Sequence, residues 1–151
     1  MITTESKASP ADEEELYATY GIMGGYNQPQ AHVQVYLNMI LFQMDPQEAL
    51  DASRISLFAH PGHKKLSDRG EGADGPSSND ITCVGVEDDL DPEVVEGLRK
   101  LGHHVQVYSG NCRKKFGRGQ VIRKESKDGD SVLVYSGGSD PRGDGASVPF
   151  L

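Results

Sequence analysis

The segment from Val33 to Met44 constrains this chain most, because it is apolar on almost every side of a helix. Its apolar residues follow helical spacing on one side and fill the opposite side as well; they are Val33, Tyr36, Leu37, Ile40, Leu41 and Met44, then Val35, Met39 and Phe42. A helix of this kind is buried and needs cover on more than one face. The few polar residues in and beside it, His32, Gln34 and Asn38, are expected to be hydrogen-bonded within the fold.

A pair of glycines, Gly24 and Gly25, stands shortly before this segment, and Pro29 suits the first turn of the helix. Glycine has no Cβ, so it adopts positive φ and lets another group touch its peptide N–H. Adjacent N–H groups near a helix start suit a developing negative charge, as in an oxyanion hole. The ordinary alternative is a tight turn, which glycine pairs commonly mark. From these residues alone both interpretations stand.

Length and composition indicate about one globular domain. The chain has 151 residues, of which 36% are hydrophobic and 25% charged, and it contains 18 glycines. That length is enough for one hydrophobic core. A net charge of −8 argues against a nucleic-acid or anionic-membrane partner. The basic cluster Arg113–Lys115 is local, and we interpret it as a solvated surface.

The sequence carries no cofactor or metal signature. It contains no phosphate-binding loop and no dinucleotide fingerprint, so no cofactor is expected. His60 and His63 lack cysteine partners and are expected to be surface histidines. Cys83 and Cys112 lack metal-ligand spacing and are expected to be free thiols. No apolar run reaches the roughly 20 residues that span a bilayer, and Met1–Lys7 lacks the apolar core of a signal peptide.

Local signals predict an α/β (α+β) chain with mostly antiparallel strands and about three helices. Asp45-Pro46 and Asp91-Pro92 are typical helix starts, in which aspartate caps and proline takes the first helical position. The expected strands cover residues 16–23, 55–58, 81–86, 105–108, 119–123 and 131–135, with Asp128-Gly129 in the last turn. The helix after Asp91 is expected to end at Gly102 and to face the core with Val94, Val95, Leu98 and Leu101.

We expect residues 1–151 to form a single partial domain with two polar segments. Residues 1–15 are acidic and polar, and they are expected to form a hairpin or a flexible arm. Residues 60–80 combine glycine, proline and charges, which predicts an exposed loop insertion. Asp140 and Arg142, near the end of the chain, are expected to tie the last strand to its neighbours through an ion pair.

Five blocks in order resemble the γ-glutamyltranspeptidase family of N-terminal-nucleophile hydrolases. The blocks are Gly24–Val35, Asn38–Met39, Met44–Arg54, Phe116–Gln120 and Gly138–Ala146. The resemblance extends over most of residues 16–148, apart from the loop near residues 60–80. It implies an αββα sandwich, of which this chain is the C-terminal portion of the small subunit.

The departures from the family pattern concern both shape and chemistry. Ser53 stands where the family usually has proline, and Gly21-Ile22-Met23 replaces a Gly-Ser/Thr-Pro start. In the family, autocatalytic cleavage creates an N-terminal threonine that is the nucleophile, usually in a Thr-Thr-His context. Here Thr3-Thr4 is followed by Glu5, so the nucleophile is not in this chain.

The resemblance implies γ-glutamyl transfer or hydrolysis, with Gly24 and Gly25 as the oxyanion-stabilising pair. Gln28 and Gln30 stand beside them, either hydrogen-bonding substrate or capping the helix start. The chain alone is expected to be inactive and to need a complementary chain, or self-association, to cover its apolar surface. The alternative is a non-catalytic binding or assembly module derived from the same fold.

Overall fold

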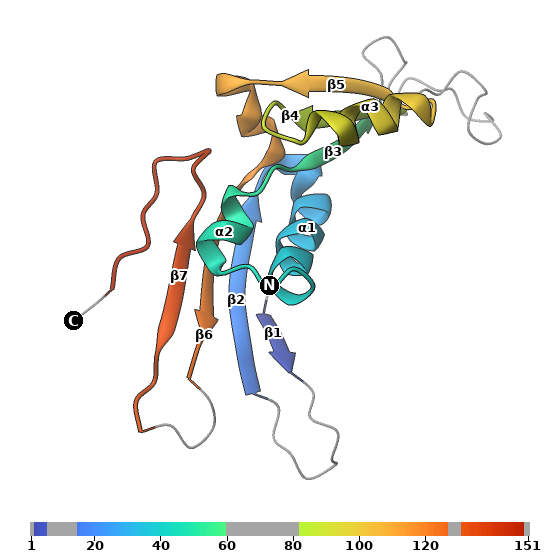
Figure 1. Ribbon diagram of the computed structural model, residues 1–151. Helices are drawn as coiled ribbons and strands as arrows, with labels where there is room; N and C mark the ends of the chain where they lie inside the picture. Colours follow the sequence, from blue (N-terminus) through green and yellow to red (C-terminus); the bar gives the residue numbers. More distant parts are fainter. Residues whose placement is uncertain (1, 6–14, 60–81, 127–130, 150–151) are drawn as a thin grey trace, which may run out of the picture. The chain divides into compact units, whose positions relative to one another are not determined.

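The computed structural model describes residues 2–5, 15–59, 82–126 and 131–149, and the chain divides into two compact units (Figure 1). Unit 1 combines Met1–Ala52 with Arg113–Leu151, and unit 2 is Ser53–Cys112. The expected loop at residues 60–80, and most of the expected arm at residues 1–15, lie outside the described residues. A single partial domain therefore stays a prediction.

Unit 1 contains an antiparallel sheet whose strands occur in the order β1-β2-β6-β7. The strands are β1 (Ile2–Glu5), β2 (Glu15–Met23), β6 (Arg118–Lys124) and β7 (Tyr135–Ser139). Along β2, Tyr20 and Ile22 are buried whereas Gly21 and Met23 are exposed, as the period of two in a strand requires. One face of the sheet therefore forms the core.

Two helices, α1 (Gln28–Ile40) and α2 (Pro46–Asp51), lie against that face (Figure 1). A short 3₁₀ helix, η1 (Gly25–Asn27), leads into α1. The core joins two strands and both helices through Tyr20, Ile22, Ala31, Val35, Met39, Ala49, Leu50 and Val121. Asp45 accepts a hydrogen bond from Glu48 N–H, and the Glu48 carboxylate accepts one from Asp45 N–H, which confirms the predicted helix start.

Within the described chain α1 is buried along one stripe only, so its burial on more than one face stays a prediction that needs a complementary chain. The buried stripe of α1 is Ala31, Val35 and Met39, whereas Val33 is 56% and Phe42 67% exposed. Within unit 1, the sheet and α2 pack on one side of the helix, and no described element of that unit covers the other. The helix also ends at Ile40, four residues before the predicted end at Met44.

The polar residues of α1 are hydrogen-bonded, as predicted. Gln34 Nε2 donates to the Gln30 carbonyl at 3.0 Å, and Asn38 Nδ2 donates to the Ala49 carbonyl at 3.2 Å. The second bond joins α1 to α2. His32 uses both ring nitrogens, as described below.

Helix α2 lies directly on β7 because Gly138 has no side chain. A Cβ at Gly138 would stand 2.6 Å from the Pro46 carbonyl. Beside this contact, the Gln47 carboxamide pairs with the backbone of Ser139. It accepts from Ser139 N–H at 3.0 Å and donates to Ser139 O at 2.9 Å. Gln47 thus takes the place of a neighbouring strand at the end of β7.

The last strand does not lie where the sequence predicted. It was expected at residues 131–135, but β7 runs from Tyr135 to Ser139, with Tyr135 opposite Lys124. Pairing with β6 sets this register, and it overrides the stronger β propensity of Val132–Val134, which are exposed. The predicted turn at Asp128-Gly129 lies outside the described residues.

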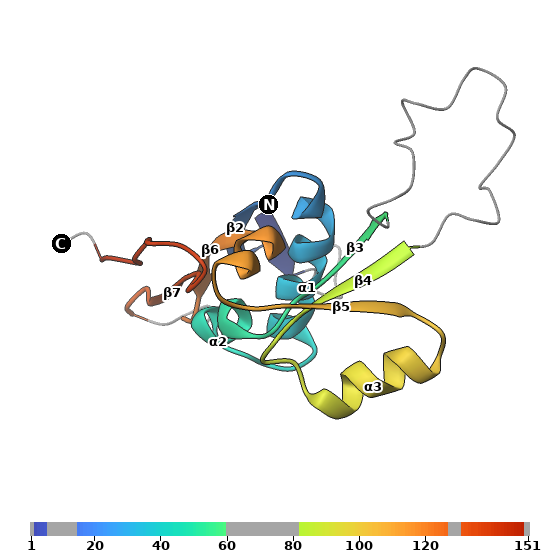
Figure 2. The same ribbon diagram turned by 90° about the horizontal axis from the view of Figure 1, so that it is seen from above.

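Unit 2 is a small sheet with one helix, α3 (Pro92–Lys100), alongside it (Figure 2). Its strands β3 (Ile55–Ala59), β4 (Thr82–Glu87) and β5 (His104–Tyr108) occur in that order. The β3–β4 pair is antiparallel and the β4–β5 pair is parallel, joined through α3. Asp91 caps α3 by accepting from Glu93 N–H, as predicted.

Only part of the predicted inward stripe of α3 faces the core. Val95 packs with Val84 and Val86, and Leu98 packs against this cluster. Val94 is 49% and Leu101 77% exposed, so their inward assignment is wrong. A nine-residue helix presents a narrow stripe, and Leu101 lies beyond its end.

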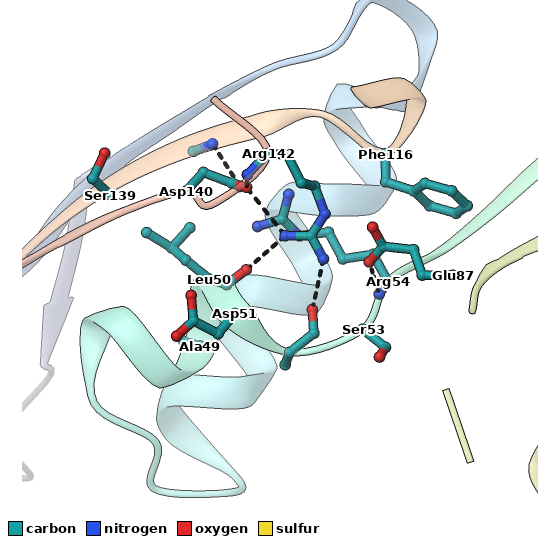
Figure 3. A network of polar contacts seen from close by, with 12 residues as sticks. Ala49, Leu50, Asp51, Ser53, Arg54, Glu87, Phe116, Ser139, Asp140 and Arg142 are labelled. Carbon is teal, nitrogen blue, oxygen red and sulfur yellow. Dashed lines mark hydrogen bonds and ion pairs between the residues drawn. The ribbon is translucent and has the colours of Figure 1, made fainter. Parts of the chain in front are cut away.

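A buried ion pair anchors the end of the chain in unit 1 (Figure 3). The Asp140 carboxylate accepts from Arg142 Nη1 at 3.1 Å and from Gly119 N–H at 2.9 Å. Arg142 Nη1 also donates to the Leu50 carbonyl at 2.8 Å, and its Nη2 donates to the Ala52 carbonyl at 3.1 Å. The predicted Asp–Arg tie is therefore confirmed. Beyond joining β6 and β7, it satisfies carbonyl groups at the end of α2.

We expect Asp140→Asn to destabilise unit 1 by about 3–5 kcal/mol, because it removes the carboxylate that pairs with the buried Arg142 guanidinium. Asp144→Asn, at an exposed carboxylate close by, is the matched control and should change stability by less than about 0.5 kcal/mol. Urea unfolding followed by circular dichroism measures both variants. Equal effects of the two variants would contradict the anchor.

Candidate functional site

The residues from Met23 to Gln28, here called the glycine turn, connect the end of β2 to the start of α1. β2 pairs with β6 up to Met23, which stands opposite Arg118. Gly24 follows, then η1 begins at Gly25. The turn therefore starts where the ladder of strand hydrogen bonds stops.

Gly24 is a glycine because it lies against the backbone of Gly117. A Cβ at Gly24 would stand 2.9 Å from Gly117 Cα, closer than real side chains come. Gly117 has φ +90, and a Cβ there would stand 2.8 Å from the Met23 carbonyl oxygen. Two backbones thus cross in contact, and neither position has room for a side chain.

Gly25 is a glycine for a different reason. Its φ is +57, a left-handed conformation that is costly for residues with a Cβ. No atom lies within 4 Å of where a Cβ would stand, so the space beside Gly25 is open. Tyr26, the next residue, has a fully exposed side chain.

Asn27 fastens the turn to the segment before β6. Its Nδ2 donates to the Phe116 carbonyl at 2.9 Å, and its N–H donates to the Gly24 carbonyl at 3.1 Å. The side chain is buried, and its Oδ1 has no hydrogen-bond partner among the described residues. The hydrogen bond from Asn27 to Phe116 joins residues 89 positions apart, so no local sequence pattern reveals it.

His32 holds the turn from the helix side. Its Nδ1 lies 2.7 Å from the Gln28 carbonyl, and Ile22 N–H donates to its Nε2 at 3.3 Å. The Tyr20 hydroxyl donates to the His32 carbonyl at 3.4 Å. Burial raises the pKa of Tyr20 above its ordinary value of 10.0, and the neighbouring Tyr36 phenol raises it further, so this phenol stays protonated at neutral pH.

These contacts leave two backbone donors available. Among the hydrogen bonds of the described residues, none uses the N–H of Gly24 or of Gly25 as its donor. Both stand just ahead of α1, where the helix dipole favours negative charge. Two such donors on a turn held from three directions suit an anionic oxygen.

The two predicted glutamines lie at the start of α1 in different surroundings. Gln28 is exposed, and its side chain makes no hydrogen bond within the described part of the chain. Gln30 is half-buried, and its carbonyl accepts from Gln34. The residue that caps α1, Asn27, makes no side-chain capping bond. A substrate contact at Gln28 or Gln30 stays a prediction.

The described residues offer neither a metal cluster nor a membrane-spanning helix. No group of three or more His, Cys, Asp or Glu is placed there to hold a metal ion. His60 and His63 lie outside the described residues. Within the same ranges, no helix is both long and apolar enough to cross a membrane.

Comparison with known proteins identifies the family. The sequence pattern of the family described as Gamma-glutamyltranspeptidase matches residues 8–150. This chain belongs to the γ-glutamyltranspeptidase family. A curated relative, the glutathione hydrolase-like YwrD proenzyme of Bacillus subtilis, is 28% identical over 129 residues; the match covers 85% of this chain and 20% of that protein.

Solved structures of the γ-glutamyltranspeptidase family share the fold. The cephalosporin acylase from Bacillus halodurans is 32% identical, with a TM-score of 0.64 over 87% of this chain and 20% of that chain. A γ-glutamyltranspeptidase from Pseudomonas nitroreducens, complexed with L-DON, is 18% identical, with a TM-score of 0.59 over 99% of this chain and 62% of that chain. The chain thus spans about a fifth of the length of its first relatives, and it matches part of their fold.

Gly24→Ala should destabilise unit 1 by about 1–3 kcal/mol, because the new methyl group would overlap Gly117. The matched control is Gly97→Ala within α3, where no atom lies within 4 Å of the added Cβ. That variant should gain about 0.5–1 kcal/mol from helix propensity. Chemical unfolding measures both; a Gly24→Ala protein as stable as the wild type would contradict the close crossing.

Proposed function

We propose that this chain is the C-terminal part of the small subunit of a γ-glutamyltranspeptidase-like acyl-transfer enzyme, and that Gly24 and Gly25 stabilise its oxyanion. The observation that carries this proposal is a pair of N–H donors, at Gly24 and Gly25, with no acceptor among the described residues, on a turn that Asn27 and His32 hold in place. Membership of the family supports it.

The chemistry would proceed by acylation of a threonine that another segment supplies. Threonine oxygen attacks the substrate amide carbonyl, and its own α-amine takes the proton. The carbonyl oxygen becomes an anion that Gly24 N–H and Gly25 N–H hold. The α-ammonium returns its proton to the leaving amine as the C–N bond breaks. Water or a second amine then attacks the acyl-enzyme, and the threonine oxygen leaves and is reprotonated. In such sites one oxyanion donor contributes roughly 10²–10³ in kcat.

The substrate class that fits best is a γ-glutamyl amide, with glutathione the type named for the curated relative. The identity of 32% to a cephalosporin acylase favours a second candidate, an acyl amide with a different leaving group. Gln28, which is exposed at the start of α1, is the side chain we assign to contact the acyl group or its carboxylate.

A complementary chain would cover the outer face of α1. Val33 stands on that face, and Leu41 and Phe42 follow directly after the helix ends; their side chains are 56%, 65% and 67% exposed. Large apolar side chains exposed together in one segment mark an interaction surface. The family relatives are longer than this chain, and their remaining parts are the cover we propose.

The isolated chain should release no p-nitroaniline from γ-glutamyl-p-nitroanilide above the blank. Expressed together with the segment encoded directly upstream, it should do so, and that segment should contain a Thr-Thr-His sequence. Gly25→Val in the assembled protein should reduce kcat by a larger factor than it changes KM, because it disturbs a transition-state contact. Hydrolysis by the chain alone would contradict the need for a threonine from another segment. An upstream stop codon with no partner segment would favour a non-catalytic assembly module.

The isolated chain should also self-associate through the outer face of α1. Replacing Val33, Leu41 and Phe42 with glutamine should lower the weight-average mass in sedimentation velocity. The matched control replaces Val94 and Leu101, which are similarly exposed on or beside α3, and should leave the mass unchanged. A wild-type chain that is a clean, cooperatively unfolding monomer would count against the missing cover.

A further inference from the structure

The imidazole of His32 contacts Gln28, at one end of the glycine turn, and Ile22, the residue directly before its other end. On one side Nδ1 lies 2.7 Å from the carbonyl of Gln28, the first residue of α1. On the other side Nε2 accepts from the N–H of Ile22, two residues before Gly24. A nitrogen facing a carbonyl must carry hydrogen, and one facing an N–H must not. The two contacts together assign the neutral Nδ1–H tautomer.

We propose that His32 is the positioning residue of the glycine turn, and that protonation of its ring releases the β2 end of that turn. The neutral ring joins the end of β2 to the first turn of α1, across both glycines. A second ring proton would put N–H against the N–H of Ile22, and that hydrogen bond would be lost. The bond to the Gln28 carbonyl would remain, so His32 would hold the turn at its α1 end only.

The surroundings of the ring supply no described counter-charge for a protonated form. From β2, the Tyr20 ring lies 5.6 Å from the imidazole, and Tyr36 of α1 stacks on Tyr20 at 6.4 Å. The first turn of α1 contains no acidic residue, and no ion pair joins His32 to a described carboxylate. Tyr20 and Tyr36 are phenols, so histidine is the side chain here whose type changes charge between pH 5 and 8.

This inference deepens the proposed function and rests on it in one respect. If Gly24 and Gly25 bind the oxyanion, the ring sets where their N–H groups point, and acid would weaken catalysis without touching the nucleophile. The hydrogen bonds themselves do not depend on that function. A structural measurement therefore tests the role of His32 separately from activity.

The experiment is amide hydrogen exchange of the full chain at pH 8 and pH 5, corrected for intrinsic exchange rates, with peptides that cover Ile22. In the wild type, protection at Ile22 should fall about tenfold between pH 8 and pH 5, the effect of losing one hydrogen bond. In His32→Gln, the glutamine Oε1 accepts from Ile22 N–H and does not titrate, so protection should be equal at both pH values. In His32→Phe, protection should be low at both.

Peptides from α3 serve as an internal control for global unfolding and should show no change. Equal protection of Ile22 in the wild type at both pH values would overturn the inference, and so would wild-type protection in His32→Phe. In the assembled enzyme, His32→Gln should keep its kcat at pH 5 better than the wild type. An inactive assembly with the expected exchange pattern would reject the proposed function and leave the role of His32 standing.

Discussion

The contact between Gly24 and Gly117 is the constraint on which the rest of unit 1 depends. Two backbone segments that are far apart in sequence touch without intervening side chains. This crossing sets where β2 must stop pairing and where α1 can begin. Gly25 then turns through positive φ into open space, and among the described residues the N–H groups of Gly24 and Gly25 donate to no acceptor. A methyl group at the crossing would disturb all of these features together.

The buried pair of Asp140 and Arg142 supports that arrangement from β7, at the same end of the sheet. It ties β7 to β6 through Gly119 and holds the final carbonyls of α2. Because Asn38 joins α2 to α1, the anchor also influences the helix that begins at the glycine turn. Removing a buried charge is costly because its partner remains in a site with little water. The polar contacts of unit 1 thus form a chain from its last residues to its candidate site.

Local chemistry predicted the helix starts, since aspartate, proline and glutamate within four positions contain the whole capping motif. Local runs of strand-forming residues likewise predicted most of the strands. The sequence could not predict which side of α1 would be covered, because that depends on Tyr20 and Ile22 of a distant strand. It placed β7 too early because pairing partners, and not propensity, set the register. The glycine pair was recognised, but the contact with Gly117 and the hydrogen bond from Asn27 to Phe116 were not, since both join residues far apart in sequence.

The carboxamide of Gln47 has a consequence for how this chain meets other molecules. Where β7 ends, the outward N–H and carbonyl of Ser139 are already occupied by a side chain of the same chain. An incoming strand would have to expel Gln47 before it could extend the sheet there. A protein with much uncovered apolar surface is at risk of fibre-like growth by strand addition. The Gln47 amide blocks strand addition at this position, because it occupies the backbone groups that an added strand would need. Assembly is thereby directed toward side-chain packing on α1 and away from backbone pairing at this edge.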